Sequence, residues 1–130
     1  GDLVLIDDCY NANPVSTKAA LDLLSLADGR KVAVLGDMFE LGAEEEKLHY
    51  ETGRYVAGCG LDQIICIGTL AKQYLAGITD VDPSANVIWF ATLEEAKAKL
   101  PDLLKEQDAI LVKASHGMHF EKIVAYFREM

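Results

Sequence analysis

The sequence lacks any apolar run approaching the roughly 20 residues of a membrane-spanning helix, and it does not open with the basic and apolar regions of a signal peptide. Basic residues are also scarce: 12 lysines and arginines stand against 21 aspartates and glutamates, a formal net charge of −9. A nucleic-acid-binding surface would be basic, so we expect neither a nucleic-acid partner nor a membrane span. The three cysteines form no CxxC pair and are expected to be free thiols in a reducing cytoplasm.

Complete catalytic motifs are missing as well. The chain has neither a Walker A phosphate loop nor a GxGxxG run after its first apolar stretch. Its three histidines are not spaced with cysteines or carboxylates in the manner of zinc ligands, so no metal site is expected. No nucleophile and base can be paired from the sequence. We therefore expect the chain to supply part of a functional site, with no catalytic residue of its own.

The 130 residues, 51% of them hydrophobic, suffice for one domain with a proper core. Five apolar runs alternate with helical patterns, and each run is continuous rather than alternating. Continuous runs are typical of strands buried on both faces, as in parallel sheets. The pattern predicts a single α/β domain over residues 1–130, with a mostly parallel central sheet between helices on both faces. The predicted strands are Leu3–Asp7, Lys31–Gly36, Gln63–Gly68, Asn86–Phe90 and Ala109–Lys113.

Helical patterns fill the intervals between these strands. They run over about 14–27, 43–58, 69–76, from 93 onward, and from 115 to the end. Thr69 and Thr92 are expected to act as N-caps of the helices that follow them. Pro101 is expected to break the fourth helix into two pieces, because proline lacks a backbone N–H. Residues 78–85 are expected to form a surface loop.

Polar residues gather at the carboxyl ends of the predicted strands. In a parallel sheet these ends come to one edge, which is where α/β domains bind ligands. The first strand leads into a polar loop, and Asn13-Pro14 there has the composition of a helix N-cap and first helical position. Simpler roles stay open for several members of this edge, such as backbone binding by Asp7 and Asp8 or an aspartate partner for Lys113. The edge residues are Asp7, Asp8, Asp37, Thr69, Thr92, Lys113, Ser115 and His116.

Three of these polar segments carry a family resemblance. Residues 7–16, DDCYNANPVS, resemble the DDxYNANPxS signature of the Mur ligase family. Residues 34–42, VLGDMFELG, are similar to the family's VLGDMxELG segment, and Leu48-His49 and Gly53 follow at its spacing. Residues 111–118, LVKASHGM, look like its LVKGSRGM segment. The three segments end three different strands, and the resemblance covers nearly the whole chain.

The resemblance implies a Rossmann-like C-terminal domain, a fragment of a three-domain ligase. Its partners would be the N-terminal domain and the central ATPase domain of the same protein, which would hold the phosphate loop and the Mg²⁺ ligands. ATP would phosphorylate a peptide carboxylate, and an amine would then attack the acyl phosphate. The motifs match members that join D-Ala-D-Ala to UDP-N-acetylmuramoyl-tripeptide in peptidoglycan precursor synthesis. We accordingly expect a monomeric, cytoplasmic bacterial enzyme that uses ATP and Mg²⁺, with the fragment alone inactive.

The resemblance also suggests roles for individual residues. Asp8 would accept hydrogen bonds from ribose hydroxyls, with Tyr10 and Asn11 as further nucleotide contacts. The expected substrate contacts are Asn13, Lys113, Ser115 and His116. Asn13 has the competing role of a plain N-cap, and His49 could serve only in packing or capping. The family usually has arginine in place of His116, and an imidazole that is mostly neutral at pH 7 would bind an anion more weakly or leave it to Lys113.

Two other function classes fit parts of the pattern. A receiver-like signalling domain also has five alternating units, paired acids after the first strand and a lysine after the last. It needs a phosphoacceptor aspartate after the third strand, however, where this chain has Gly68-Thr69. A stand-alone nucleotide-binding or interaction module is the other alternative. The sequence leaves open whether the third residue of the tripeptide is lysine or diaminopimelate.

Overall fold

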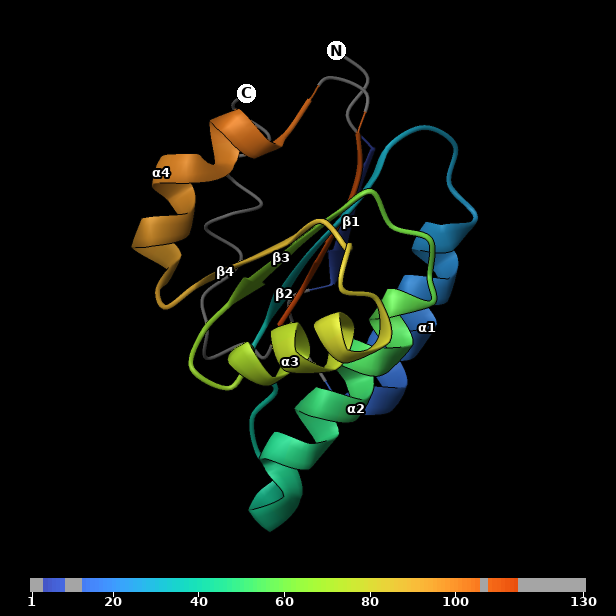
Figure 1. Ribbon diagram of the computed structural model, residues 1–130. Coiled ribbons are helices and arrows are strands. Elements are labelled where there is room, and N and C mark those ends of the chain that lie inside the picture. Colours follow the sequence, from blue (N-terminus) through green and yellow to red (C-terminus); the bar gives the residue numbers. More distant parts are fainter. Residues whose placement is uncertain (1–3, 9–12, 106–107, 115–130) are drawn as a thin grey trace.

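The computed structural model describes residues 4–8, 13–105 and 108–114, and side chains from Asn13 onward within those ranges (Figure 1). Strands and helices alternate along the chain, as the hydrophobic pattern predicted. In chain order the elements are β1 (Val4–Asp8), α1 (Pro14–Ser25), β2 (Lys31–Gly36), the short 3₁₀ helix η1 (Gly42–Glu44), α2 (Glu45–Ala57), β3 (Gln63–Ile67), α3 (Lys72–Val81), β4 (Val87–Phe90), α4 (Leu93–Leu103) and β5 (Ala109–Lys113).

The five described strands form one sheet in the order β1-β5-β2-β3-β4, and every pairing is parallel. The chain moves in one direction across the sheet from β1 to β4 and then returns, so that β5 lies between β1 and β2. Right-handed crossovers place the helices of forward and return connections on opposite faces. Accordingly α1, α2 and α3 cover one face and α4 covers the other (Figure 1). The predicted α/β fold with a parallel sheet between helices is confirmed.

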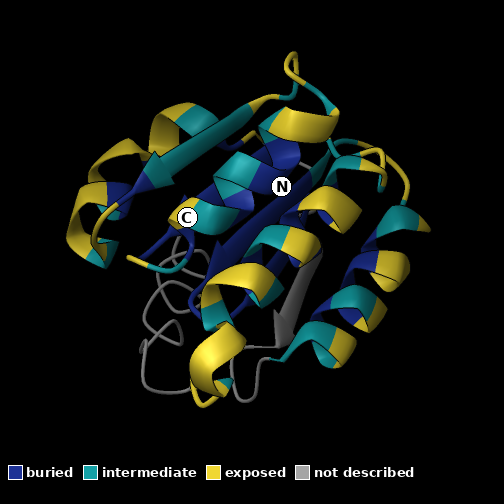
Figure 2. Ribbon diagram, turned by 60° about the horizontal axis from the view of Figure 1, so that its bottom comes forward, coloured by how far each residue is buried: buried dark blue, intermediate teal, exposed yellow. Residues whose placement is uncertain are grey.

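Each face of the sheet carries its own apolar core. Side chains alternate along a strand, so Val32 and Val34 of β2 pack toward Leu100 of α4. The intervening Ala33 and Leu35 pack toward Leu21 and Leu24 of α1. Figure 2 shows the central strands as buried between helices whose outer surfaces are exposed. Burial on both faces explains why the strands read as continuous apolar runs.

Helices α2 and α3 touch through glycines. A Cβ atom at Gly53 of α2 would lie 2.8 Å from the Cα of Tyr74 on α3, closer than real Cβ contacts allow. A Cβ atom at Gly77 of α3 would lie 2.9 Å from the backbone nitrogen of Arg54 on α2. The two backbones therefore approach each other so closely that only glycine fits at either position.

The third helix differs from the sequence prediction in both its bounds and its cap. It was expected near 69–76 and a loop over 78–85, but α3 spans Lys72–Val81. The helix continues because Ile78 is fully buried against the sheet and Gly77 contacts α2. The predicted Thr69 N-cap is wrong, since the N-cap residue is Ala71 and it makes no side-chain capping bond. The Ala71 N–H at the start of the helix instead donates to the Asp37 carboxylate.

The fourth helix also corrects one expectation and confirms another. Pro101 does not break α4, which runs without interruption over Leu93–Leu103. Proline stands in the last turn, so only one intrahelical N–H bond is lost, and the Leu104 N–H still reaches the Leu100 carbonyl at 3.1 Å. The Thr92 cap is confirmed, because its hydroxyl accepts the Glu95 N–H at 3.2 Å. The helix predicted after Ser115 lies outside the described residues.

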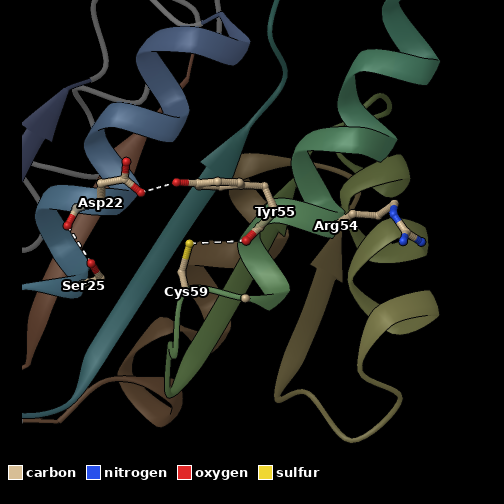
Figure 3. Close-up of a pocket in the computed structure, with 6 residues that line it drawn as sticks. Asp22, Ser25, Arg54, Tyr55 and Cys59 are labelled. Carbon is tan, nitrogen blue, oxygen red and sulfur yellow. Dashed lines mark hydrogen bonds between the residues drawn. The ribbon is translucent and has the colours of Figure 1, made fainter.

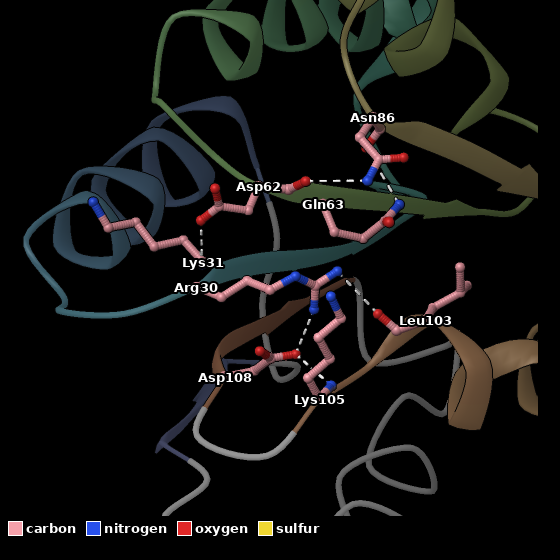
Figure 4. Close-up of polar contacts among 8 residues, drawn as sticks. All are labelled: Arg30, Lys31, Asp62, Gln63, Asn86, Leu103, Lys105 and Asp108. Atoms are coloured by element: carbon pink, nitrogen blue, oxygen red, sulfur yellow. Dashed lines mark hydrogen bonds and ion pairs between the residues drawn. The ribbon is translucent and has the colours of Figure 1, made fainter.

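The amino ends of the strands are closed by a polar network (Figure 4). Arg30, which precedes β2, pairs with the buried Asp108 before β5 at 2.7 Å and donates to the Leu103 carbonyl at 3.1 Å. The Asp62 carboxylate accepts the Lys31 N–H at 2.8 Å, and Asn86 donates to the Asp62 carbonyl at 3.2 Å. These contacts tie together the starts of β2, β3, β4 and β5 and the end of α4.

Candidate functional site

The carboxyl edge of the sheet brings the three motif segments together. Strand β1 ends at Asp8 and β5 at Lys113, and these two residues are partners in the parallel register. Lys113 is in turn the partner of Leu35, one residue before the end of β2. The end of β5 therefore lies between the ends of β1 and β2. The predicted meeting of the three motif segments at one edge is confirmed for the strand ends that carry them, while residues 9–12 and 115–118 lie outside the described residues.

Lys113 is more enclosed than a surface anion contact would be. Its exposed fraction is 2%, and alternation along β5 places it on the same face as Ala109 and Leu111, toward α1. A buried ammonium group needs polar neighbours to replace lost water, and Lys113 is engaged in such interactions. Its expected contact with a substrate carboxylate stays a prediction.

Asn13 serves as the N-cap of α1. Its side-chain oxygen accepts the Ser16 N–H at 2.9 Å, and the Ser16 hydroxyl accepts the Asn13 N–H at 3.1 Å. This reciprocal pair satisfies two N–H groups at the start of the helix, and Pro14 at the first position has none to satisfy. The capping role is confirmed, while the expected substrate contact of Asn13 is untested.

The other expected ligand contacts lie outside the described side chains. Tyr10 and Asn11 fall in the undescribed run 9–12, and Ser115 and His116 fall in 115–130. Asp8 is described only as the backbone at the end of β1. Their roles therefore rest on the motif resemblance alone.

The loop after β2 contains a buried carboxylate that the sequence had not explained. Asp37 is 6% exposed and accepts the Ala71 N–H at 2.7 Å, so it bonds the turn that opens α3. Burial raises the pKa of Asp37 even though the N–H groups of Ala71, Leu70 and Thr69 favour the carboxylate. Gly68, at φ +124°, has to be glycine there, because a Cβ atom would lie 2.6 Å from the Asp37 carboxyl carbon. Asp37 thus joins the loops that follow β2 and β3.

His49 holds the same loop from α2. Its Nε2 accepts the Met38 N–H at 2.9 Å, and its Nδ1 lies 2.6 Å from the Glu45 carbonyl oxygen. A backbone N–H can only donate and a carbonyl can only accept, so the ring is neutral with its proton on Nδ1. The ring packs 5.0 Å from that of Tyr74, whose hydroxyl donates to the Gly36 carbonyl at 3.0 Å. The packing role considered for His49 is therefore confirmed.

Acid should destabilise the domain through His49. Burial lowers the pKa of His49 below its ordinary value of 6.5, although Glu45 and Asp37 oppose the shift. The unfolded chain therefore binds more protons than the folded chain below that value, and stability falls as pH drops through this window. Asp37 has a raised pKa and acts in the opposite sense at lower pH, where its protonation favours the folded state.

We expect His49→Gln to be less stable than the parent at neutral pH but to lose less stability on acidification. An amide can accept the Met38 N–H without titrating. Urea unfolding at about pH 7.5 and about pH 5.5 measures the difference. His116 and His119 are present in both proteins, so their contribution cancels. Equal losses in both proteins would remove His49 from the acid response.

A shallow pocket between α1 and α2 lies at the far end of the domain from this edge (Figure 3). Tyr55 donates its hydroxyl hydrogen to the Asp22 carboxylate, and this bond raises the pKa of Tyr55 to about 12. The lining residues come from the last turns of the two helices and from the two residues that follow α2. They are Asp22, Ser25, Arg54, Tyr55, Gly58 and Cys59.

No metal centre is apparent within the described ranges, where no three histidine, cysteine, aspartate or glutamate residues cluster as ligands. Among those residues no helix is both long and apolar enough to cross a bilayer. The fold and the carboxyl edge together define a doubly wound α/β domain whose ligand site would be built from strand-end loops.

The chain belongs to the Mur ligase family, because the family model "Mur ligase, glutamate ligase domain" matches residues 1–116. It is 36% identical over 128 residues to the UDP-N-acetylmuramoyl-tripeptide–D-alanyl-D-alanine ligase of Escherichia coli, covering 97% of this chain and 27% of that one. The enzyme of the same name from Rickettsia prowazekii is 33% identical over 126 residues, covering 95% of this chain and 27% of its own. The chain thus spans about a quarter of the length of the curated relatives it matches.

Solved structures agree with the sequence relatives. A crystal structure of MurF from Acinetobacter baumannii matches with a TM-score of 0.88 and 35% identity, over 98% of this chain and 28% of that one. MurF ligase from Thermotoga maritima, solved in complex with ADP, matches with a TM-score of 0.78 and 25% identity, over 98% of this chain and 28% of that one. The Rossmann-like fold expected from the motifs is that of the matching part of these ligases.

Proposed function

We propose that this chain is the C-terminal domain of a three-domain, ATP-dependent ligase that joins D-Ala-D-Ala to UDP-N-acetylmuramoyl-tripeptide. The observation that carries the proposal is that the strand ends carrying the three motif segments, those of β1, β5 and β2, lie side by side at one edge of the sheet. The names of the relatives supply the reaction, which makes a peptide precursor of the cell wall. The ligase would work in the bacterial cytoplasm as a monomer.

The carboxyl edge would form one wall of the nucleotide and amine sites. Asp8, Tyr10 and Asn11 would contact the ribose and adenine, because a carboxylate accepts hydroxyl hydrogens and an aromatic face stacks on a base. Asn13, Lys113, Ser115 and His116 would lie toward the incoming dipeptide, whose carboxylate a cation can bind. The other wall, with the UDP-N-acetylmuramoyl-tripeptide that donates the acyl group, would come from the N-terminal and central domains.

ATP and Mg²⁺ would be bound by different parts of the full-length ligase. Among the described residues no three ligating side chains cluster, and Asp37 is already bonded to the start of α3. The motif resemblance assigns the Mg²⁺ ligands to the central domain. The motif resemblance assigns ATP to this edge, where Asp8 and Lys113 end adjacent strands.

The receiver-like alternative loses support at Asp37. A phosphoacceptor must be open to a phosphate donor, whereas Asp37 is 6% exposed and accepts the Ala71 N–H at 2.7 Å. Acetyl phosphate should consequently leave Asp37 unlabelled.

The proposed reaction predicts a defined substrate requirement in the full-length protein. ADP should form only when D-Ala-D-Ala and UDP-N-acetylmuramoyl-tripeptide are both present, and not when L-glutamate replaces the dipeptide. Running the assay with lysine-containing and diaminopimelate-containing tripeptides identifies the third residue. The isolated chain should form no ADP. ADP formation that depends on L-glutamate, or that ignores D-Ala-D-Ala, would assign the chain to a different ligase.

A further inference from the structure

A chain of buried contacts links α2 to the first turn of α1 through Met38. The Met38 N–H donates to His49 Nε2 at 2.9 Å, and the Met38 sulfur accepts the hydroxyl hydrogen of Thr17 at 3.6 Å. Met38 and His49 are 0% exposed and Thr17 is 1% exposed. Water has no access to these groups, so each polar atom depends on the partner seen here.

Thr17 connects this chain of contacts to the signature motif. It is the fourth residue of α1, and its N–H donates to the Asn13 carbonyl at 2.9 Å. Asn13 caps the helix and lies within the signature motif, residues 7–16. A shift of Thr17 would therefore move the start of α1, where the motif segment enters the helix.

The loop that carries Met38 cannot readily move to follow Thr17. Gly36 accepts a bond from Tyr74, Asp37 bonds the turn before α3, and Met38 bonds His49 on α2. Three consecutive residues are thus fixed by α2 and by α3 or its leading turn. Met38 thus presents its sulfur to Thr17 of α1 from a loop that is bonded on three sides.

Thr52 gives a contrast on the neighbouring helix. It is also 1% exposed, but its hydroxyl donates to the Leu48 carbonyl of its own helix at 2.8 Å. That hydrogen bond stays within α2 and does not connect the helix to another element. Of these two buried threonines, Thr17 alone reaches from one element of the fold to another.

We propose that Thr17, Met38 and His49 are positioning residues that hold the first turn of α1 against the loop after β2 and thereby support adenine-nucleotide binding at the carboxyl edge of the sheet. The inference rests on the function proposed above. None of the three would contact the substrates. Their role is to fix the first turn of α1 relative to the loop after β2.

The test compares Thr17→Val with Thr52→Val in the full-length enzyme. Each substitution removes one buried hydroxyl and keeps the shape of the side chain. Thr17→Val should raise the KM for ATP and weaken ADP binding by about three-fold, the order expected for one modest hydrogen bond, with kcat and the KM for UDP-N-acetylmuramoyl-tripeptide unchanged. Thr52→Val should leave nucleotide affinity at the parent value. Thr17→Ser, which keeps the hydroxyl, should restore most of the affinity.

Equal nucleotide affinities for Thr17→Val and Thr52→Val would overturn the inference. If Thr17→Val does not fold, Met38→Leu carries the same expectation, because leucine fills similar space without an acceptor. Equilibrium ADP binding gives a readout that does not need turnover. A parent enzyme that binds ADP but forms none from D-Ala-D-Ala would contradict the proposed function, while the binding comparison would still decide the role of Thr17.

Discussion

Replacing Gly53 with alanine should strongly destabilise the domain. The new methyl group would lie 2.8 Å from the Tyr74 Cα, and the obstacle is backbone, which cannot rotate aside. Helices α2 and α3 would have to separate, which would disturb the buried Tyr74 and Ile78. Overpacking typically costs about 1–3 kcal/mol and occasionally more, and a backbone clash belongs at the upper end. That is a large share of the roughly 5–15 kcal/mol that stabilises a domain.

Gly58→Ala provides the matched control for this prediction. Gly58 ends the same helix at a negative φ, and a Cβ there would lie 3.6 Å from the Tyr55 carbonyl oxygen, an ordinary contact. Urea unfolding of the three proteins measures the difference in midpoint at constant slope. Gly77→Ala should behave like Gly53→Ala, because it meets the backbone of α2 in the same way. Similar midpoints for Gly53→Ala and Gly58→Ala would contradict the close packing of α2 on α3.

The sheet was predictable because its signal is local. Continuous apolar runs such as Val32–Leu35 and Ile64–Ile67 identify strands covered on both faces, and all five predicted runs are strands. Polar caps such as Asn13 and Thr92 were predictable for the same reason, since the capping residue and its partner lie three positions apart. The gathering of the motifs at one edge then follows from parallel strands alone.

Long-range contacts explain what the sequence did not predict. The start of α3 is bonded by Asp37, 34 residues earlier in the chain, and its extension past Ala76 depends on contact with α2. Neither partner is visible in a local window. The burial of Lys113 could have been inferred, because it continues the alternation of Ala109 and Leu111 toward the α1 face. The helix break predicted at Pro101 was wrong, because a proline in the last turn removes only one helical bond.

Among the proposed ligand contacts, replacing Asp8 should raise the KM for ATP the most. It ends β1 beside Lys113 in register, and the motif resemblance gives it the ribose hydroxyls. Hydrogen bonds to a charged group contribute about 1.5–3 kcal/mol, so Asp8→Ala in the full-length enzyme should raise the KM for ATP by roughly ten-fold or more. Asn11→Ala should act in the same direction with a smaller effect, since an amide is uncharged.

The measurement that tests the central claim most directly is the KM for ATP of the full-length enzyme carrying Asp8→Ala, compared with Asp28→Ala. Asp28 is an exposed carboxylate in the turn after α1, at the opposite end of the sheet. If the carboxyl edge of the sheet faces the nucleotide, Asp8→Ala should raise the KM for ATP at least about ten-fold while Asp28→Ala leaves it unchanged. Equal KM values for the two variants would contradict the assignment of this edge to the nucleotide site.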